Sequence, residues 1–213
     1  MKLTSVNVGA ERPIRNAKSS GRTGIFKLPV DGPAALTPLG LAGDAIVDTE
    51  NHGGPDQAIY LFTLPDYAWW SAHVGRSLEP GTFGENLTLS DLDSASLNVG
   101  DRLRIGRVLL EVTSPRIPCV TLAARMGDPA FVKKFRRAEK PGVYCRVIEA
   151  GDVQTGDPVE LLPYQGTRVS MLEFFRAFYQ RRPSPDLLRC LLDTPVHLKA
   201  RVEYEALLAQ PVR

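Results

Sequence analysis

The sequence predicts a mainly β fold, a barrel with packed helices, followed by a small α-helical domain, and therefore an α+β protein overall. Over residues 1–163, short apolar runs alternate with Gly, Pro, Asp and Asn, the punctuation of a β domain. Gly-Asp corners recur before expected strands, at Gly43-Asp44, Gly100-Asp101 and Gly156-Asp157. After Pro163 the pattern becomes helical, so we expect two domains, 1–163 and 164–213.

Nine segments of the first domain have the length and composition of strands. They cover residues 2–8, 24–29, 44–47, 58–62, 86–88, 102–105, 108–113, 143–148 and 158–162. Strands of this length, joined by closely spaced corners, are typical of a barrel.

Helices are expected at two places that interrupt the strands. One covers residues 65–73 and contains Trp69 and Trp70. The other begins with Asp128 as N-cap and Pro129 in the first turn. A further helical stretch covers residues 120–126.

The C-terminal segment has the signals of three helices. Ser170 and Glu173 have the spacing of a capping box, and Ser184-Pro185 is a typical helix start. A third helix is expected over residues 198–209. This unit is too small for a core of its own, so we expect it to dock on the barrel or on a second subunit, which would make a homodimer.

Composition excludes several classes of protein. The 213 residues carry 26 Lys and Arg against 24 Asp and Glu, a net charge of +2 that argues against bulk nucleic-acid binding. No apolar run approaches the roughly 18 residues of a membrane span, and the N-terminal residues lack a signal-peptide pattern, so we expect a cytoplasmic protein. Three cysteines without C-x-x-C spacing argue against a disulfide scaffold or a cysteine-rich zinc site.

Cys119 is the first candidate for chemistry. It ends the run Ser114-Pro115-Arg116-Ile117-Pro118-Cys119, in which two prolines stiffen the connection between a strand and a helix. A helix N-terminus and a neighbouring arginine both favour the thiolate, the form that binds metals or attacks electrophiles. The alternative is a buried, inert cysteine.

Two polar loops provide further candidates. The first contains Asn51, His52, Gly53, Gly54 and Asp56, whose glycines can turn backbone N–H groups toward a ligand, while its side chains offer donors, acceptors and a titratable ring. A simple hairpin loop is the alternative, and one His with one carboxylate is a weak metal site.

The second loop contains Thr23, Gly24 and Lys27, preceded by Lys18, and this combination suits a phosphate or another oxyanion. A solvated basic loop is the alternative reading. Farther along, Glu85 and Asn86 can pair with the edge of a heterocycle, or they can satisfy the backbone of a bulge.

Several of these runs together resemble one family. They are Gly40-Leu41-Ala42-Gly43-Asp44, His52-Gly53-Gly54-Pro55-Asp56, Gly81-Thr82-Phe83-Gly84-Glu85-Asn86-Leu87, Pro115-Arg116-Ile117-Pro118-Cys119 and Gly142-Val143-Tyr144-Cys145-Arg146-Val147. In this order they resemble the MOSC domain, the molybdenum cofactor sulfurase C-terminal domain. The helical tail resembles the three-helix extension of its YiiM-type subgroup.

The resemblance implies a pyruvate-kinase-barrel-like β-barrel that binds the molybdenum cofactor, a molybdopterin, with Cys119 as the protein ligand to the metal. It also implies reduction of N-hydroxylated compounds, such as 6-N-hydroxylaminopurine, to amines. A thiolate is a suitable ligand for such a metal. With that cofactor, His52 would donate protons with Asp56 orienting it. The remaining candidates would bind the cofactor or the substrate edge: Lys18, Thr23, Gly24, Lys27, Asn51, Gly53, Gly54, Glu85, Asn86 and Arg116.

Electrons are expected from outside the chain. The sequence has no flavin or nicotinamide fingerprint and too few cysteines for an iron–sulfur cluster, so we expect a separate flavoprotein reductase. Two other functions remain open. The first is a carrier of the molybdenum cofactor or of persulfide sulfur, which would use Cys119. The second is a non-enzymatic barrel that binds a phosphate-bearing ligand or RNA.

Overall fold

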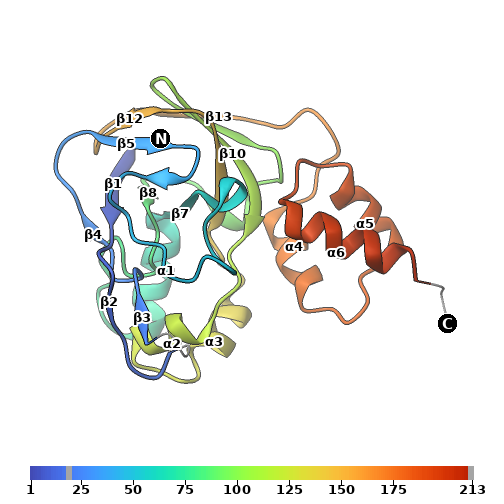
Figure 1. Ribbon diagram of the computed structural model, residues 1–213, viewed down its shortest axis with the longest axis horizontal. Helices are drawn as coiled ribbons and strands as arrows, with labels where there is room; N and C mark the ends of the chain where they lie inside the picture. Colours follow the sequence, from blue (N-terminus) through green and yellow to red (C-terminus); the bar gives the residue numbers. More distant parts are fainter. Residues whose placement is uncertain (18–20, 211–213) are drawn as a thin grey trace.

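The computed structural model describes residues 1–17 and 21–210 and shows a mixed α+β protein with a strand-rich part and a helical C-terminal part (Figure 1). The strands are β1 (Leu3–Val8), β2 (Arg12–Pro13), β3 (Arg22–Thr23), β4 (Leu28–Pro29), β5 (Ala34–Thr37), β6 (Gly40–Leu41), β7 (Ile59–Thr63), β8 (Leu87–Leu89), β9 (Arg102–Ile105), β10 (Val108–Pro115), β11 (Val143–Glu149), β12 (Gly151–Val153) and β13 (Val159–Leu162). The helices are α1 (Leu64–Val74), α2 (Val120–Met126), α3 (Phe131–Ala138), α4 (Met171–Phe178), α5 (Pro185–Leu192) and α6 (Leu198–Leu208).

Eight strands form one large sheet in the order β13-β9-β10-β11-β7-β8-β1-β4, with β7 and β8 parallel and the other neighbours antiparallel. The sheet does not close into the expected barrel. The start of β1, which is the last strand but one in this order, meets the start of β13 through an isolated bridge between Lys2 and Pro158. A few backbone hydrogen bonds accompany it, such as Leu3 N–H to the Asp157 carbonyl at 2.9 Å, but no continuous ladder joins the two strands among the described residues. The chain therefore builds a strongly curved, open sheet.

Seven of the nine predicted strands are confirmed, and two are wrong for a common reason. Of residues 24–29 only Leu28–Pro29 pairs as a strand, and residues 44–47 form none. These two segments pack against each other instead: a Cβ on Gly24 would lie 1.9 Å from the Ala45 carbonyl oxygen. The sequence analysis also missed the small sheet β12-β5-β6 and the hairpin β2-β3.

The predicted helices are all present. Ser170 and Glu173 form the expected capping box of α4, and the Ser184 side chain caps α5. One start is corrected: α3 begins at Phe131 after Ala130, while Asp128 accepts a hydrogen bond from the Ala130 N–H at 2.8 Å. No helix among the described residues is long and apolar enough to cross a membrane.

Two apolar clusters hold the elements together. The first joins the sheet to the C-terminal helices, because Phe174, Leu191 and Tyr204 belong to the same buried cluster as the strand residues. The second is aromatic and joins β7 and β11 to α1, α2 and α3. Its aromatic members are Tyr60, Phe62, Tyr67, Trp70, Phe83, Phe131, Phe135, Tyr144 and Phe175. The C-terminal helices therefore pack on the strand-rich part without an independent core.

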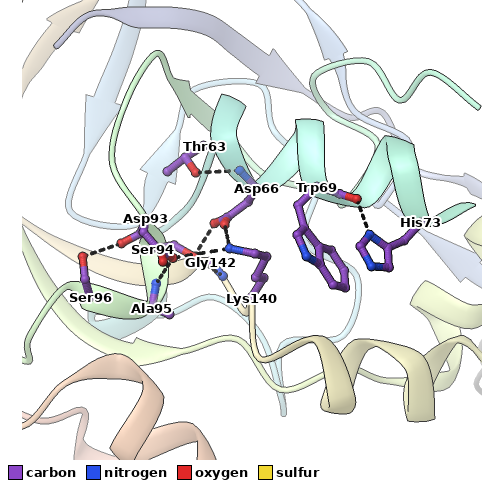
Figure 2. A network of polar contacts seen from close by, with 10 residues as sticks. All are labelled: Thr63, Asp66, Trp69, His73, Asp93, Ser94, Ala95, Ser96, Lys140 and Gly142. Atoms are coloured by element: carbon purple, nitrogen blue, oxygen red, sulfur yellow. Dashed lines mark hydrogen bonds and ion pairs between the residues drawn. The ribbon is translucent and has the colours of Figure 1, made fainter.

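A buried ionic network fixes the start of α1 (Figure 2). Asp66 is fully buried and accepts hydrogen bonds from Ser94 Oγ at 2.5 Å and from Lys140 Nζ at 2.9 Å. Ser94 Oγ in turn accepts from the Gly142 N–H at 3.1 Å, just before β11. The network ties α1 to two connections that lie far away in sequence.

We expect Lys140→Met to lower the free energy of unfolding by about 3 kcal/mol, because it leaves the buried Asp66 carboxylate without its cation. Chemical denaturation would measure the loss. The double variant Asp66→Asn, Lys140→Met removes both charges and should recover part of it. An unchanged denaturation midpoint for Lys140→Met would contradict this account of the network.

Candidate active site

One cavity collects most of the predicted site residues. It lies where the loops around β3, the segment before β7 and the connection from β10 to α2 converge. Its lining includes Thr23, Gly24, Lys27, Asp44, His52, Gly53, Gln57, Tyr60, Asn86, Arg116, Cys119 and Tyr144. Residues from widely separated parts of the chain thus share one wall.

Cys119 lies at the N-terminal end of α2, partly exposed to this cavity. Burial raises the pKa of its thiol, but the hydrogen bond with His52, the charge of Arg116 and the Leu122 backbone N–H together lower it to about 6. The other two cysteines differ. Cys145 is buried in β11, where burial raises its pKa well above the ordinary value, and Cys190 is exposed on α5.

Arg116 places a buried cation in the cavity wall. Its guanidinium carbon lies 5.1 Å from the Tyr60 ring centre and 5.8 Å from that of Phe135. Burial acts to lower the pKa of Arg116, but Tyr60, Tyr144 and Cys119 raise it above its ordinary value. One terminal nitrogen, Nη1, is buried without a hydrogen-bond partner among the described residues. A buried guanidinium with a spare donor fits an anionic group of a ligand.

Lys27 supplies a second buried cation in the lining. Burial lowers the pKa of its ammonium group, and the ion pair with Asp44 counteracts that effect. Asn86 completes the group. Its side-chain N–H donates to Asp44 Oδ2 at 2.9 Å, and its side-chain oxygen Oδ1 accepts from the Tyr60 backbone N–H at 3.1 Å. Asn86 therefore holds the cavity wall together as well as lining it.

Two glycines let their loops pack closely against the segment around Ala45 and Ile46. Gly24 approaches the Ala45 backbone too closely for any side chain, and a Cβ on Gly53 would lie 2.9 Å from the Ile46 side chain. Thr23 is buried beside Gly24, and its hydroxyl accepts from the Ile25 N–H at 3.1 Å. The Thr-Gly and Gly-Gly loops thus meet across the segment around Ala45 and Ile46.

His52 faces both the thiol and a tyrosine. Its Nδ1 lies 3.4 Å from the Tyr144 hydroxyl, and its Nε2 lies 4.0 Å from Asp48. Together with the hydrogen bond to Cys119, these contacts fix the ring over the sulfur. The expectation that Asp56 orients His52 is not met. Asp56 instead pairs with Arg146 at 2.9 Å and accepts from the Leu198 N–H at the start of α6 at 2.7 Å.

Three other candidates lie away from this cavity. Asn51 is exposed and bonds to Asp48 at 3.0 Å, and Gly54 is exposed at the start of a short 3-10 turn. Glu85 is fully buried, where it accepts from the Tyr67 hydroxyl and the Gly81 N–H, and burial raises its pKa. The remaining candidate, Lys18, lies outside the described residues.

A second cavity adjoins the first on the side of the C-terminal helices. Both are lined by His52, Gln57, Cys119 and Tyr144. The helices contribute Phe174, Phe178, His197, Lys199, Ala200, Glu203 and Tyr204 to its lining. Burial lowers the pKa of His197 to about 4, and its ring stacks on Phe174 at 5.9 Å. The sulfur of Cys119 therefore lies between a cationic cavity and an aromatic one.

Sequence reasoning missed several residues of this site. Tyr144 lines both cavities because of the strand register: Tyr144 of β11 pairs with Ser114 of β10, two residues before Arg116. Asp44 was expected only at a corner and at the start of a strand, although it anchors Lys27 and Asn86. Both residues stand within the runs that carry the family resemblance, which was the available signal.

The site fits a large anionic cofactor that offers a metal to a thiolate. Two buried cations, one with an unpartnered donor, line the same cavity as a low-pKa thiol. Among the described residues there is no group of three or more His, Cys, Asp or Glu side chains that can hold a metal ion. A metal bound at Cys119 would therefore need its other ligands from another group.

The fold and this site define an α+β protein with a reactive thiolate in a cationic cavity. Comparison with known families is specific: the MOSC domain matches residues 48–160. The chain belongs to the MOSC-domain family. It is 35% identical over 160 residues to the uncharacterized protein YflK of Bacillus subtilis, covering 75% of this chain and 72% of that protein.

YiiM proteins are similar in both sequence and structure. The chain is 33% identical over 141 residues to YiiM of Escherichia coli, covering 65% of this chain and 63% of that protein. The crystal structure of YiiM from Geobacillus stearothermophilus has a TM-score of 0.81 at 27% identity, covering 98% of this chain and 99% of that one. The YiiM-type resemblance, with its helical extension, is confirmed.

A third relative is a protein named as a reductase. The chain is 32% identical over 170 residues to a protein of Gibberella moniliformis named "Reductase", covering 77% of this chain but only 30% of that protein. The matched part of that protein is thus one portion of a much longer chain.

In cofactor-free protein, we expect Cys119 to be alkylated by iodoacetamide with a half-maximal rate near pH 6, because the thiolate is the reacting form. Mass spectrometry of the labelled peptide would give the profile. His52→Ala should move the midpoint upward, since it removes a hydrogen bond to the sulfur. Cys190, which is exposed, provides the internal reference, and a Cys119 midpoint equal to that of Cys190 would contradict the assignment.

Proposed function

We propose that this protein is a molybdenum-cofactor-dependent reductase that converts N-hydroxylated compounds, such as 6-N-hydroxylaminopurine, to amines. Its electrons come from a separate flavoprotein reductase. The observation that carries the proposal is the position of Cys119: a low-pKa thiol in a cavity whose wall contains the buried cations Lys27 and Arg116. Membership of the MOSC-domain family and the reductase name of one relative support it.

Each part of the cavity has a task in this proposal. Cys119 is the metal ligand, and Lys27 and the free Nη1 of Arg116 bind the phosphate or the pterin. Thr23, Gly24 and Gly53 line the same cavity and contact the cofactor there. When bound, the molybdenum cofactor supplies two-electron redox chemistry that no side chain can provide.

The protein supplies protons and position. Reduction of an N–OH group to an amine breaks the N–O bond and consumes two electrons and two protons, releasing one water. His52 is the proton donor nearest to the sulfur, and the Tyr144 hydroxyl, 3.4 Å from Nδ1, orients the ring. The aromatic second cavity holds the organic part of the substrate, with Phe174 and His197 in its wall.

A sulfur carrier remains the second candidate, because a persulfide also needs a low-pKa cysteine. The two cations beside the thiol favour the cofactor-dependent reductase, since a persulfide has no phosphate to bind. Sulfur transfer by protein that holds no molybdenum would favour the carrier.

Cys119→Ala should abolish reduction of 6-N-hydroxylaminopurine and lower the molybdenum content of protein made in a host that synthesises the cofactor. Elemental analysis, pterin fluorescence and turnover would be measured together. Cys190→Ala is the matched control, because it removes an exposed thiol that lines neither cavity. Full turnover by Cys119→Ala would refute the role assigned to this sulfur.

Loaded protein should show no reduction with NADPH alone and should become active with dithionite-reduced methyl viologen. The reason is that the chain has no sequence motif for binding the nicotinamide or flavin that hydride transfer needs. Product amine would be measured by chromatography. Turnover with NADPH and no added reductase would contradict the need for a separate donor.

A further inference from the structure

A third cavity lies between α1 and α3, away from the site described above. Its lining comprises Trp69, Trp70, His73, Val74, Arg76, Met126, Asp128, Phe131, Lys134, Arg137 and Ala138. Trp69 and His73 lie one turn apart on α1 (Figure 2). Their rings are stacked, with centres 3.5 Å apart. The indole nitrogen of Trp70 is buried without a hydrogen-bond partner among the described residues. The cavity is therefore aromatic, with an unused donor in its wall.

Positive charge surrounds this cavity. Helix α3 carries four exposed cations, Lys133, Lys134, Arg136 and Arg137, and no acid. One carboxylate, Asp128, lines the described part of the cavity, and it is already paired with Lys134 at 2.8 Å. The surface thus has an excess of positive charge, although the whole chain is nearly neutral.

Three more arginines extend the positive surface beside α2. Arg12 and Arg125 both lie over the Phe26 ring, at 4.2 and 4.7 Å. Burial lowers the pKa of Arg125, and the like charges of Arg12 and Arg76 lower it further. Within the described part of the chain, Arg12, Arg76 and Arg125 have no carboxylate partner. Like charges brought together in this way are stabilised when an acidic surface covers them.

The aromatic cluster connects this cavity directly to the catalytic one. Trp70 lines the third cavity and stacks on Phe135, with ring centres 5.6 Å apart. Phe135 in turn lies 5.8 Å from the guanidinium of Arg116, which lines the cavity of Cys119. The Phe135 ring therefore lies between Trp70, which lines the third cavity, and Arg116, which lines the cavity of Cys119.

From this arrangement we propose that the α1–α3 face, with Arg76, Lys133, Arg137 and the third cavity, is the docking surface for an acidic electron-donor flavoprotein. The proposal rests on the proposed function, because only an enzyme that takes electrons from outside needs such a surface. Charge complementarity identifies the partner's chemistry, and aromatic and arginine side chains are the groups enriched in protein interfaces. In this proposal Trp70 and Phe135 lie between the docked flavoprotein and the cavity of Cys119.

The electron balance of the coupled reaction is complete. The reduced flavin hydroquinone is oxidised to the quinone and gives up two electrons and two protons. The substrate N–OH is reduced to N–H as its N–O bond breaks, and the oxygen leaves as water. No further oxidant or reductant is required.

The test compares two donors on the loaded enzyme. One is dithionite-reduced methyl viologen, a small molecule that needs no docking surface. The other is an acidic flavodoxin kept reduced by NADPH and its reductase. The variant is Arg76→Glu, Arg137→Glu, which reverses two exposed charges at this face and touches no residue of the catalytic cavity.

A matched control is available on the same chain. Arg107→Glu, Arg168→Glu changes the net charge by the same amount at two other exposed positions. Arg107 lies in the turn between β9 and β10, and Arg168 lies between β13 and α4. Neither residue lines any of the three cavities.

We expect Arg76→Glu, Arg137→Glu to lose at least tenfold of the flavodoxin-driven rate at low salt and to keep its viologen-driven rate within about twofold. The control variant should keep both rates. Added salt should slow the flavodoxin-driven reaction of the unaltered chain, because screening weakens docking. Retention of the flavodoxin-driven rate by the α1–α3 variant, or no flavodoxin-driven rate in the unaltered chain, would overturn the proposal.

Binding provides a readout that does not depend on turnover. Calorimetry with cofactor-free protein should show salt-sensitive binding of flavodoxin to the unaltered chain and to the control, and none to Arg76→Glu, Arg137→Glu. If an RNA oligonucleotide binds this face more tightly than flavodoxin does, the surface is a nucleic-acid site and the proposal is wrong. Absence of viologen-driven reduction in the unaltered chain would count against the proposed function, while the binding result would still decide the docking surface.

Discussion

The electrostatic interaction between the Cys119 thiolate and the buried Arg116 guanidinium is the interaction on which the site depends. Arg116 is almost fully buried, and a buried cation is costly unless negative charge or hydrogen bonds surround it. Cys119 supplies part of that charge, and Arg116 and His52 in return lower the pKa of its thiol to about 6. The two residues stabilise each other's charged forms, and the unused Nη1 of Arg116 leaves the pair ready for an anionic ligand.

The large sheet brings this pair to the rest of the site. Pairing of β10 with β11 places Tyr144 beside the end of β10, where it contacts His52. β11 also pairs with β7, whose Tyr60 ring lies 5.1 Å from the guanidinium carbon of Arg116. Asp56, outside the catalytic cavity, links the loop of His52 to the start of α6. The C-terminal helices are thereby positioned over the second cavity.

Local signals in the sequence were sufficient for part of this site. The stiff Pro-Arg-Ile-Pro-Cys run indicated a reactive Cys119 with Arg116 nearby, and the Gly-Gly loop indicated His52. The same reasoning paired Asp56 with His52, whereas Asp56 pairs with Arg146. It also gave Glu85 to a ligand, and Glu85 is fully buried: its Oε1 accepts from the Tyr67 hydroxyl, while its Oε2 has no partner among the described residues. A polar residue in a loop looks the same in sequence whether it faces a ligand or another part of the chain, because its partners are distant in sequence.

The sequence alone determined the elements whose signals are local: the helix caps at Ser170 and Ser184, the strands with strong apolar runs, and the family to which the chain belongs. The tertiary structure decided that the sheet stays open, that Tyr144 and Asp44 belong to the site, and that Phe135 separates two cavities. The physical reason is the distance along the chain over which each interaction acts. Capping and periodicity act within a few residues, whereas sheet register, burial and the pKa of Cys119 depend on atoms brought together only by folding.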